Sequence, residues 1–139
     1  MSLLKWAMSW FIAGMCSFFP ASGQRPDTPA AKRGAIVYEQ HCASCHQKDG
    51  NGVPRLIPPL QGTDYVSGDK SRLIRILLDG LNERIIVQEE EYYSPMASFK
   101  QLTDQQIADV LTFIRARFGG NASPVSPKEV QIQRKRPIK

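Results

Sequence analysis

Two cysteines and a histidine stand close enough together in the sequence to act as one chemical site. Cys42 and Cys45 are separated by two residues and His46 follows directly, which gives the pattern Cys-x-x-Cys-His. This pattern is the attachment signature of c-type haem. Two thiols at this spacing match the two vinyl groups of the porphyrin, and the histidine then lies beneath the iron as its proximal ligand. The sequence therefore predicts one covalently bound haem c.

Other chemistry fits the two cysteines less well. A thioredoxin-like redox pair needs a βαβ setting, which the sequence lacks. A zinc site would have to crowd His41, Cys42, Cys45 and His46 together, because no second cysteine pair follows residue 23. A disulfide between Cys42 and Cys45 suits an oxidising compartment, although it would close a very small ring. Haem attachment is the favoured interpretation.

Met96 is the candidate for the second axial ligand. It is the only methionine after residue 23, and it follows Pro95 in an expected loop between two expected helices. A thioether opposite a histidine is an electron-transfer arrangement that raises the reduction potential. Many methionines only fill core space, but the position and uniqueness of Met96 favour ligation. His41 precedes Cys42 on the proximal side, so we expect it at the surface.

The first 23 residues are typical of an export signal. Lys5 precedes a 14-residue, largely apolar stretch from Trp6 to Phe19, and small residues follow up to Gly23. The stretch is short for a membrane span, which needs about 20 apolar residues. We expect cleavage after Gly23, with an uncleaved membrane anchor as the alternative. The protein would then be periplasmic, or tethered to the outer side of the cytoplasmic membrane.

Three helices are expected to position the candidate ligands. Thr28 and Pro29 are typical of a helix start, and this helix would run to His41. A second helix spans 69–79, with apolar residues at helical spacing and a glycine after it. A capping box at 103–106 opens a third helix. The loop 47–68 is rich in glycine and proline, and a loop of this length suits a chain that wraps a large cofactor.

The remaining segments are less regular. Residues 84–87 could form a short strand or one arm of a hairpin, and the acidic run 89–91 fits a solvated turn. Residues 121–139 form a basic, proline-containing tail, which fits a disordered end or a surface that steers an acidic partner. The formal net charge of +5 does not call for nucleic acid. The expected organisation is a leader over 1–23, one domain over 24–120 and the tail.

Around these residues the chain resembles the class I c-type cytochromes, over roughly Ala30 to Gly119. The resemblance implies an all-α fold, with three main helices and long loops wrapped around one covalently bound haem. In that family the first helix crosses the last through a glycine and aromatic residues. Gly34 and Tyr38 stand at matching positions in the first helix, and Phe113 in the last. Glycine lets two helices approach closely, and aromatic side chains fill the space beside it.

The resemblance also implies what surrounds the two ligands. The segment around Pro58 is similar to one whose proline carbonyl accepts a hydrogen bond from the proximal histidine, which would orient the ring. The segment around Met96 is similar to the family's methionine loop, although Ala97 stands where the family often has proline. The candidates for contact with the haem propionates are Arg55, Arg72, Arg75 and Arg84.

With histidine and methionine on the iron, the protein would be a one-electron carrier and not an enzyme. It would act as a soluble carrier or as the electron-entry subunit of a respiratory or dehydrogenase chain. Its partners would be a redox protein donor and acceptor that dock weakly and transiently, with a membrane involved only if the leader is uncleaved. If Met96 binds the iron loosely, a haem enzyme or gas sensor is the alternative. The lack of an obvious distal acid–base residue counts against that alternative.

Overall fold

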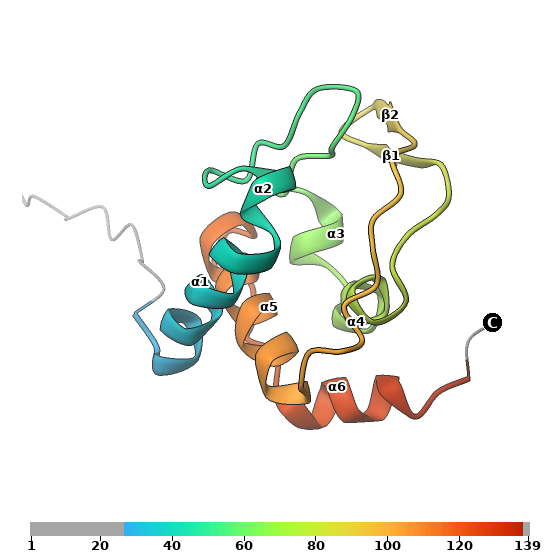
Figure 1. Cartoon of the computed structure of the whole chain (residues 1–139). Coiled ribbons are helices and arrows are strands. Elements are labelled where there is room, and N and C mark those ends of the chain that lie inside the picture. Colours follow the sequence, from blue (N-terminus) through green and yellow to red (C-terminus); the bar gives the residue numbers. More distant parts are fainter. Residues whose placement is uncertain (1–26, 138–139) are drawn as a thin grey trace, which may run out of the picture.

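The computed structural model describes residues 27–137, which form six helices and one two-stranded sheet (Figure 1). The predicted signal peptide, residues 1–23, lies outside the described residues. None of the helices in the described range has the length and apolar character needed to cross a bilayer. The predicted all-α fold is confirmed, and its elements are α1 Pro29–His41, α2 Ala43–His46, α3 Asp64–Ser67, α4 Lys70–Asp79, β1 Ile85–Val87, β2 Glu90–Tyr92, α5 Asp104–Phe118 and α6 Pro127–Arg134.

The three predicted helices are present as α1, α4 and α5, and their caps explain where they begin. The Thr28 hydroxyl accepts a hydrogen bond from the Ala31 N–H at 3.2 Å, and the Asp69 carboxylate caps α4 in the same way. Thr103 and Gln106 form the predicted capping box at the start of α5. The buried faces of α4 and α5 supply most of the core: Leu73, Ile74, Leu77, Leu78, Ile107, Val110, Leu111 and Ile114.

Helices α1 and α5 cross at Gly34, as predicted. A Cβ atom on Gly34 would collide with the carbonyl oxygen of Asp109 and lie 2.9 Å from the Cβ of Phe113. Tyr38 packs beside this point, with its ring centroid 5.3 Å from that of Phe113. The crossing therefore requires glycine at position 34, because any side chain there would push the two helices apart.

The predicted hairpin is present, and its register places one apolar residue from each arm in the interior. Ile85 pairs with Tyr92 and Val87 with Glu90 in an antiparallel ladder. Val87 and Tyr92 are buried. The expected solvated turn is only partly right, since Glu89 lies in the turn while Glu90 and Glu91 belong to β2. The long loop is irregular as far as residue 63, where the short helix α3 begins.

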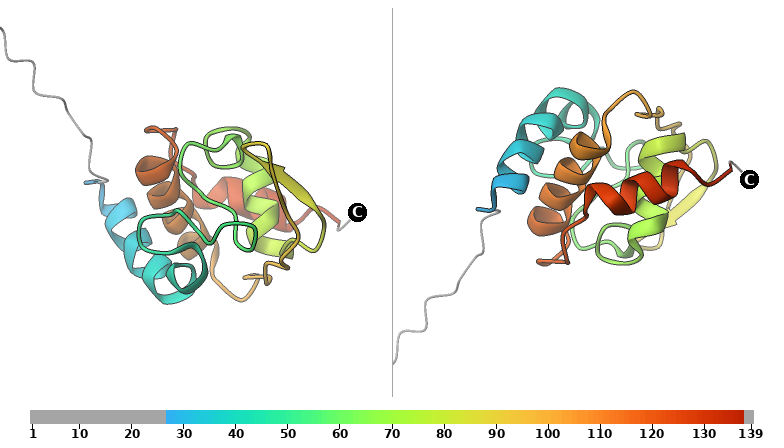
Figure 2. Two further views of the ribbon diagram at one scale, coloured as in Figure 1. Left: turned by 90° about the horizontal axis from the view of Figure 1, so that it is seen from above. Right: turned by 90° about the horizontal axis from the view of Figure 1, so that it is seen from below.

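The expectation of a disordered C-terminal end is wrong for residues 121–137. The segment turns back and α6 lies across α4 and α5 (Figure 2). Ser126 and Glu129 form a capping box that starts α6, and Val125 and Val130 are buried in the main core. The physical reason is that the segment buries only two apolar side chains, Val125 before α6 and Val130 within it, so its sequence looks polar although one side of α6 is packed.

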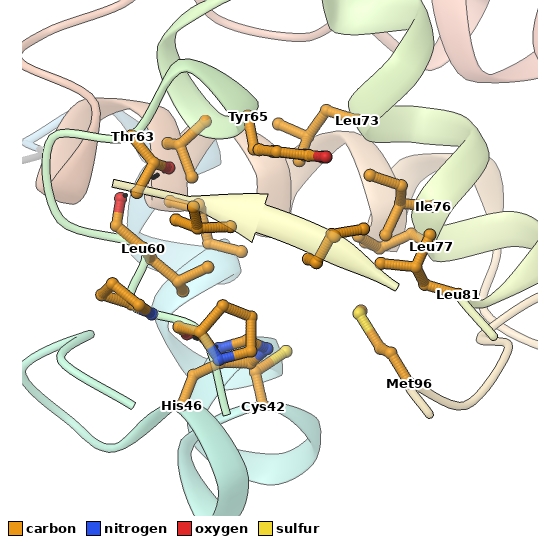
Figure 3. A pocket seen from close by; sticks show the side chains of 16 residues that line it. Cys42, His46, Leu60, Thr63, Tyr65, Leu73, Ile76, Leu77, Leu81 and Met96 are labelled. Carbon is orange, nitrogen blue, oxygen red and sulfur yellow. Dashed lines mark hydrogen bonds between the residues drawn. The ribbon is translucent and has the colours of Figure 1, made fainter. Parts of the chain in front are cut away.

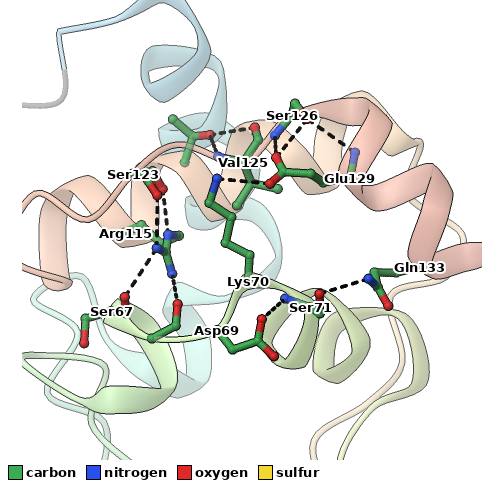
Figure 4. A network of polar contacts seen from close by, with 12 residues as sticks. Ser67, Asp69, Lys70, Ser71, Arg115, Ser123, Val125, Ser126, Glu129 and Gln133 are labelled. Carbon is green, nitrogen blue, oxygen red and sulfur yellow. Dashed lines mark hydrogen bonds and ion pairs between the residues drawn. The ribbon is translucent and has the colours of Figure 1, made fainter.

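A polar network fastens this C-terminal segment to the rest of the protein (Figure 4). Lys70 pairs with Glu129 at 3.1 Å, and the Gln133 amide donates to the Ser71 hydroxyl at 3.0 Å. Arg115 is almost fully buried, and its guanidinium donates to four carbonyl oxygens, those of Val66, Ser67, Gly68 and Ser123. Buried donors must be satisfied in this way to avoid a desolvation penalty, so Arg115 links α3, α5 and the segment before α6.

Replacing Gly34 should destabilise the protein strongly. In Gly34→Val the new side chain would meet the α5 backbone, so we expect a loss of about 3 kcal/mol or more in the free energy of unfolding. Denaturant unfolding followed by circular dichroism measures this loss. Gln40→Val is the matched control, because Gln40 is exposed on the same helix and this change costs only helix propensity, about 0.5 kcal/mol. Equal stabilities for the two variants would contradict the close crossing.

Candidate haem-binding site

An apolar cavity opens between the long loop, α4, the hairpin and the segment around Met96 (Figure 3). It contains about 630 Å³ of empty space, part of it open to solvent. A second cavity of about 790 Å³ shares six of its lining residues with the first, so the two are parts of one hollow: Cys42, His46, Pro58, Leu81, Ile85 and Met96 line both. This shared set contains three of the four side chains predicted to hold haem.

The end of α1 delivers the two cysteines and the histidine to this hollow. The Cys42 N–H donates to the Tyr38 carbonyl and ends α1, and the next turn, α2, carries Cys45 and His46. The His46 N–H donates back to the Cys42 carbonyl at 2.9 Å, which closes the turn. Cys42 is half-buried and Cys45 is exposed, and both are free thiols. The motif is thus presented as one compact turn at the mouth of the hollow.

The ionisation of Cys42 is suppressed in this environment. Burial, together with the neighbouring charge of Cys45, raises the pKa of the Cys42 thiol to about 11. The thiol therefore stays protonated at neutral pH, which is unlike the lowered pKa of a reactive redox cysteine. This environment therefore does not favour a redox pair that depends on a cysteine thiolate.

The carbonyl of Pro58 orients His46, as the resemblance to the class I c-type cytochromes implied. Its Nδ1 lies 3.1 Å from the carbonyl oxygen of Pro58. Burial lowers the pKa of His46, an effect that the bond to Pro58 partly offsets, so the ring is neutral near pH 7. A carbonyl only accepts hydrogen bonds, so Nδ1 carries the proton and Nε2 keeps its lone pair. A neutral imidazole with a free Nε2 is the form that binds a metal.

Gly52 allows the long loop to bring this carbonyl into place. It adopts φ +64°, and its N–H donates to the His46 carbonyl at 3.0 Å. A Cβ atom there would collide with the Ile57 carbonyl and lie 2.7 Å from the Pro58 carbonyl oxygen. The sequence showed Gly52 only as one of several loop glycines. Its role depends on a close backbone approach that no local pattern marks.

Met96 is held through its main chain, and its side chain is partly buried beside the core, where it lines the hollow. Its N–H donates to the Leu81 carbonyl at 2.8 Å, and its carbonyl accepts from the Leu81 N–H at 2.9 Å. Gly80, at φ +78°, permits this pairing because a Cβ there would lie 2.5 Å from the Met96 carbonyl oxygen. Figure 3 shows the thioether sulfur pointing into the cavity. The structure therefore directs the side chains of Met96 and His46 into the same hollow.

The other side chains considered from sequence lie at the rim of the hollow or outside it, and His41 is among the residues that line the second cavity. His41 is exposed at the rim, with its ring 6.1 Å from that of Phe99. None of the four candidate arginines lines either cavity. Three of them form ion pairs, Arg72 with Asp64, Arg75 with Asp79 and Arg84 with Glu91.

Two polar side chains that line the first cavity were missed. They are Thr63 and Tyr65, and Arg72 stacks on the Tyr65 ring at 4.1 Å. Nothing in the local sequence marks them, because α3 brings them to the cavity through long-range packing.

The residues present fit a haem c. The walls are almost wholly aliphatic, as a porphyrin face requires. The only titratable side chains among the lining residues of the first cavity are Cys42, His46 and Tyr65. Imidazole nitrogen and thioether sulfur form the His/Met pair of electron-transfer haem proteins, and the thiols stand beside them. That Cys42, Cys45, His46 and Met96 bind haem, with Pro58 supporting His46, stays a prediction.

Comparison with known proteins agrees with this chemistry. The model of the cytochrome c family matches residues 31–117. Cytochrome c-552 of Thermus thermophilus is 42% identical over 90 residues, which cover 62% of this chain and 68% of that protein.

Two larger relatives are cytochrome c subunits of dehydrogenases. That of the quinone-dependent alcohol dehydrogenase of Gluconobacter oxydans is 39% identical over 103 residues, and that of the gluconate 2-dehydrogenase of Pantoea cypripedii is 37% identical over 109. These matches cover 70% and 76% of this chain but only 21% and 24% of those subunits. The chain belongs to the cytochrome c family and is an electron carrier.

Proposed function

We propose that the chain binds one haem c covalently through Cys42 and Cys45, with His46 and Met96 as axial ligands. The observation that carries the proposal is the shared hollow, which takes the imidazole of His46 and the thioether of Met96 from segments far apart in the sequence. The bond between His46 Nδ1 and the Pro58 carbonyl supports it, because it leaves Nε2 free to bind iron.

When bound, the haem would accept and release one electron at its iron. The chain's own residues determine how easily that electron moves. The mostly aliphatic side chains of the hollow would surround the haem, and a methionine ligand raises the reduction potential. If His46 and Met96 both held the iron, no position on it would be left for a substrate. This arrangement favours electron transfer over the alternative of a haem enzyme or gas sensor.

The carrier would pass electrons between a redox protein donor and a redox protein acceptor. The names of the relatives support such partners, since two of them are cytochrome subunits of dehydrogenases. Export to the periplasm is part of the proposal and rests on the pattern of residues 1–23. The protein would thus serve an electron-transfer chain outside the cytoplasm, either free or tethered to the outer side of the membrane.

Covalent attachment can be tested by mass. Expressed with a haem-maturation system, the denatured protein should weigh one haem more than its polypeptide and begin near Gln24. Cys42→Ala/Cys45→Ala should lose that mass, because no thioether can form. Mass spectrometry under denaturing conditions measures both. Ser44→Ala, between the cysteines, is the control and should keep the haem. A wild-type protein without haem would refute covalent attachment. A chain that still carries residues 1–23 would refute cleavage of the leader.

Met96→Leu tests the sixth ligand. We expect the ferric protein to lose the weak absorption band near the red end of the spectrum that methionine ligation produces, and its reduction potential to fall. Visible spectroscopy and a redox titration measure the two effects. Tyr93→Phe, at an exposed position that lines neither cavity, should keep both properties. A Met96→Leu protein with the wild-type spectrum would show that another group binds the iron.

Gly52→Ala should loosen the support of His46. The left-handed backbone and the close Pro58 carbonyl together should cost more than the ~1 kcal/mol of an ordinary glycine substitution at positive φ. The His46 Nδ1 proton should also exchange faster with water, as measured by NMR. Gly62→Ala is the matched control, because Gly62 has φ +65° but its nearest atom, Gln88 Nε2, is 3.9 Å away. Equal effects of the two variants would contradict the proposed support.

A further inference from the structure

The last residue of α6, Arg134, is bonded to the loop that carries Met96. Its guanidinium donates through Nη1 to the carbonyl of Lys100 at 2.8 Å and through Nη2 to the carbonyl of Leu102 at 2.9 Å. The remaining nitrogen, Nε, donates to the Asp104 carboxylate at 2.8 Å. All three guanidinium nitrogens are therefore used. Two of the bonds reach the loop between Met96 and α5, and the third reaches the first residue of α5.

The first half of this loop is held from a different direction. Leu81 pairs with Met96 itself, as described above. The Ser98 hydroxyl donates to the Leu78 carbonyl at 2.6 Å, and the Phe99 N–H donates to the Leu77 carbonyl at 2.7 Å. These bonds satisfy carbonyls at the C-terminal end of α4, which have no partner within the helix. The end of α4 thus holds residues 96–99. Farther along, Leu102 is anchored by its buried side chain and Thr103 by the capping box, and Arg134 adds side-chain bonds to the carbonyls of Lys100 and Leu102.

The helix that carries Arg134 is itself anchored to α4. Arg75 donates to the carbonyls of Gln133 and Arg136 at 3.0 and 3.3 Å, on either side of Arg134 in the sequence. The Gln133 side chain reaches Ser71. The guanidinium therefore acts from a fixed support and not from a mobile end. The loop that carries Met96, residues 96–103, is therefore bonded to α4 on one side and to α6 on the other.

We propose that Arg134 is a positioning residue that keeps the loop closed and so holds Met96 on the iron. The inference rests on the proposed function, since it takes Met96 as the axial ligand. It concerns a segment beyond the residues that the family model matches, 31–117. Its physical basis is that charge-assisted hydrogen bonds to carbonyls are roughly twice as strong as neutral ones. Without them the part-buried Leu102 carbonyl loses its partner and the loop gains freedom to open.

The chemistry of the side chain makes arginine specific at this position. A guanidinium is planar and presents several donors in a fixed fork, so it can bind two carbonyls and a carboxylate at once. A lysine ammonium carries the same charge but cannot reproduce that geometry. Arg134→Lys should therefore hold the loop less firmly than the wild type does, much like a variant that lacks these hydrogen bonds.

The test uses haem-loaded full-length protein and free imidazole as the probe. Imidazole binds ferric iron only where methionine has left it, so its apparent dissociation constant reports how firmly Met96 is held. Arg134→Gln should bind imidazole about tenfold more tightly than the wild type, the change expected when charge-assisted hydrogen bonds are lost. The Phe99 amide proton should also exchange faster by NMR. This second readout follows the loop itself and does not depend on electron-transfer activity.

Two control variants separate bracing from charge and from general stability. Lys135→Gln removes one positive charge from the neighbouring exposed residue. Arg33→Gln removes a bidentate ion pair with Asp109 between α1 and α5, far along the chain from the methionine loop. Both should bind imidazole as the wild type does.

The outcomes keep this inference distinct from the proposed function. Arg134→Gln with the imidazole affinity of the two controls would overturn the inference and leave Met96 ligation intact. An Arg33→Gln protein with the same tightened affinity would also overturn it, because the effect would then follow overall stability. A wild type without the methionine band would overturn Met96 ligation, and the inference with it.

Discussion

The contact of α1 with α5 at Gly34 is the constraint on which the remaining structure depends. Because α1 lies directly on the α5 backbone, its C-terminal end, and with it the turn from Cys42 to His46, has a fixed place relative to the core. Arg33 strengthens the same crossing from the surface side through its bidentate bond to Asp109. The candidate haem ligands are therefore positioned by a helix crossing that lies outside the cavity.

From that crossing, the site is completed by two segments that lack regular structure. The long loop brings the Pro58 carbonyl to His46, and this approach needs the left-handed conformation and missing side chain of Gly52. The loop after β2 brings Met96, which is pinned to Leu81 and to the end of α4. Several main-chain groups at both places have hydrogen-bond partners, among them the N–H groups of Gly52, Leu60 and Met96, which helps to hold the irregular backbone. The helices fix the frame, and backbone hydrogen bonds orient the ligands within it.

Much of this arrangement could be predicted from short residue motifs in the sequence. The haem motif is contiguous, the helix caps are short motifs, and Gly34, Tyr38 and Phe113 follow a family pattern. Helix α6 could not be recognised so easily, because its sequence is mostly polar and charged and Val130 is the only apolar side chain that it buries. The capping box of Ser126 and Glu129 was a signal that could have found it. The partners of Arg134 and the placement of Tyr65 were beyond reach, since they depend on main-chain carbonyls and long-range packing that no spacing encodes.

The central claim is that His46 and Met96 bind the two faces of one haem, and NMR of the reduced protein tests it most directly. A methyl group fixed above the centre of a porphyrin is shifted far upfield by the ring current. With methionine methyl groups labelled with ¹³C, the account predicts one strongly upfield-shifted resonance that disappears in Met96→Leu. Methyl resonances that all lie in the ordinary region of the spectrum, in a protein that carries its haem, would contradict the account.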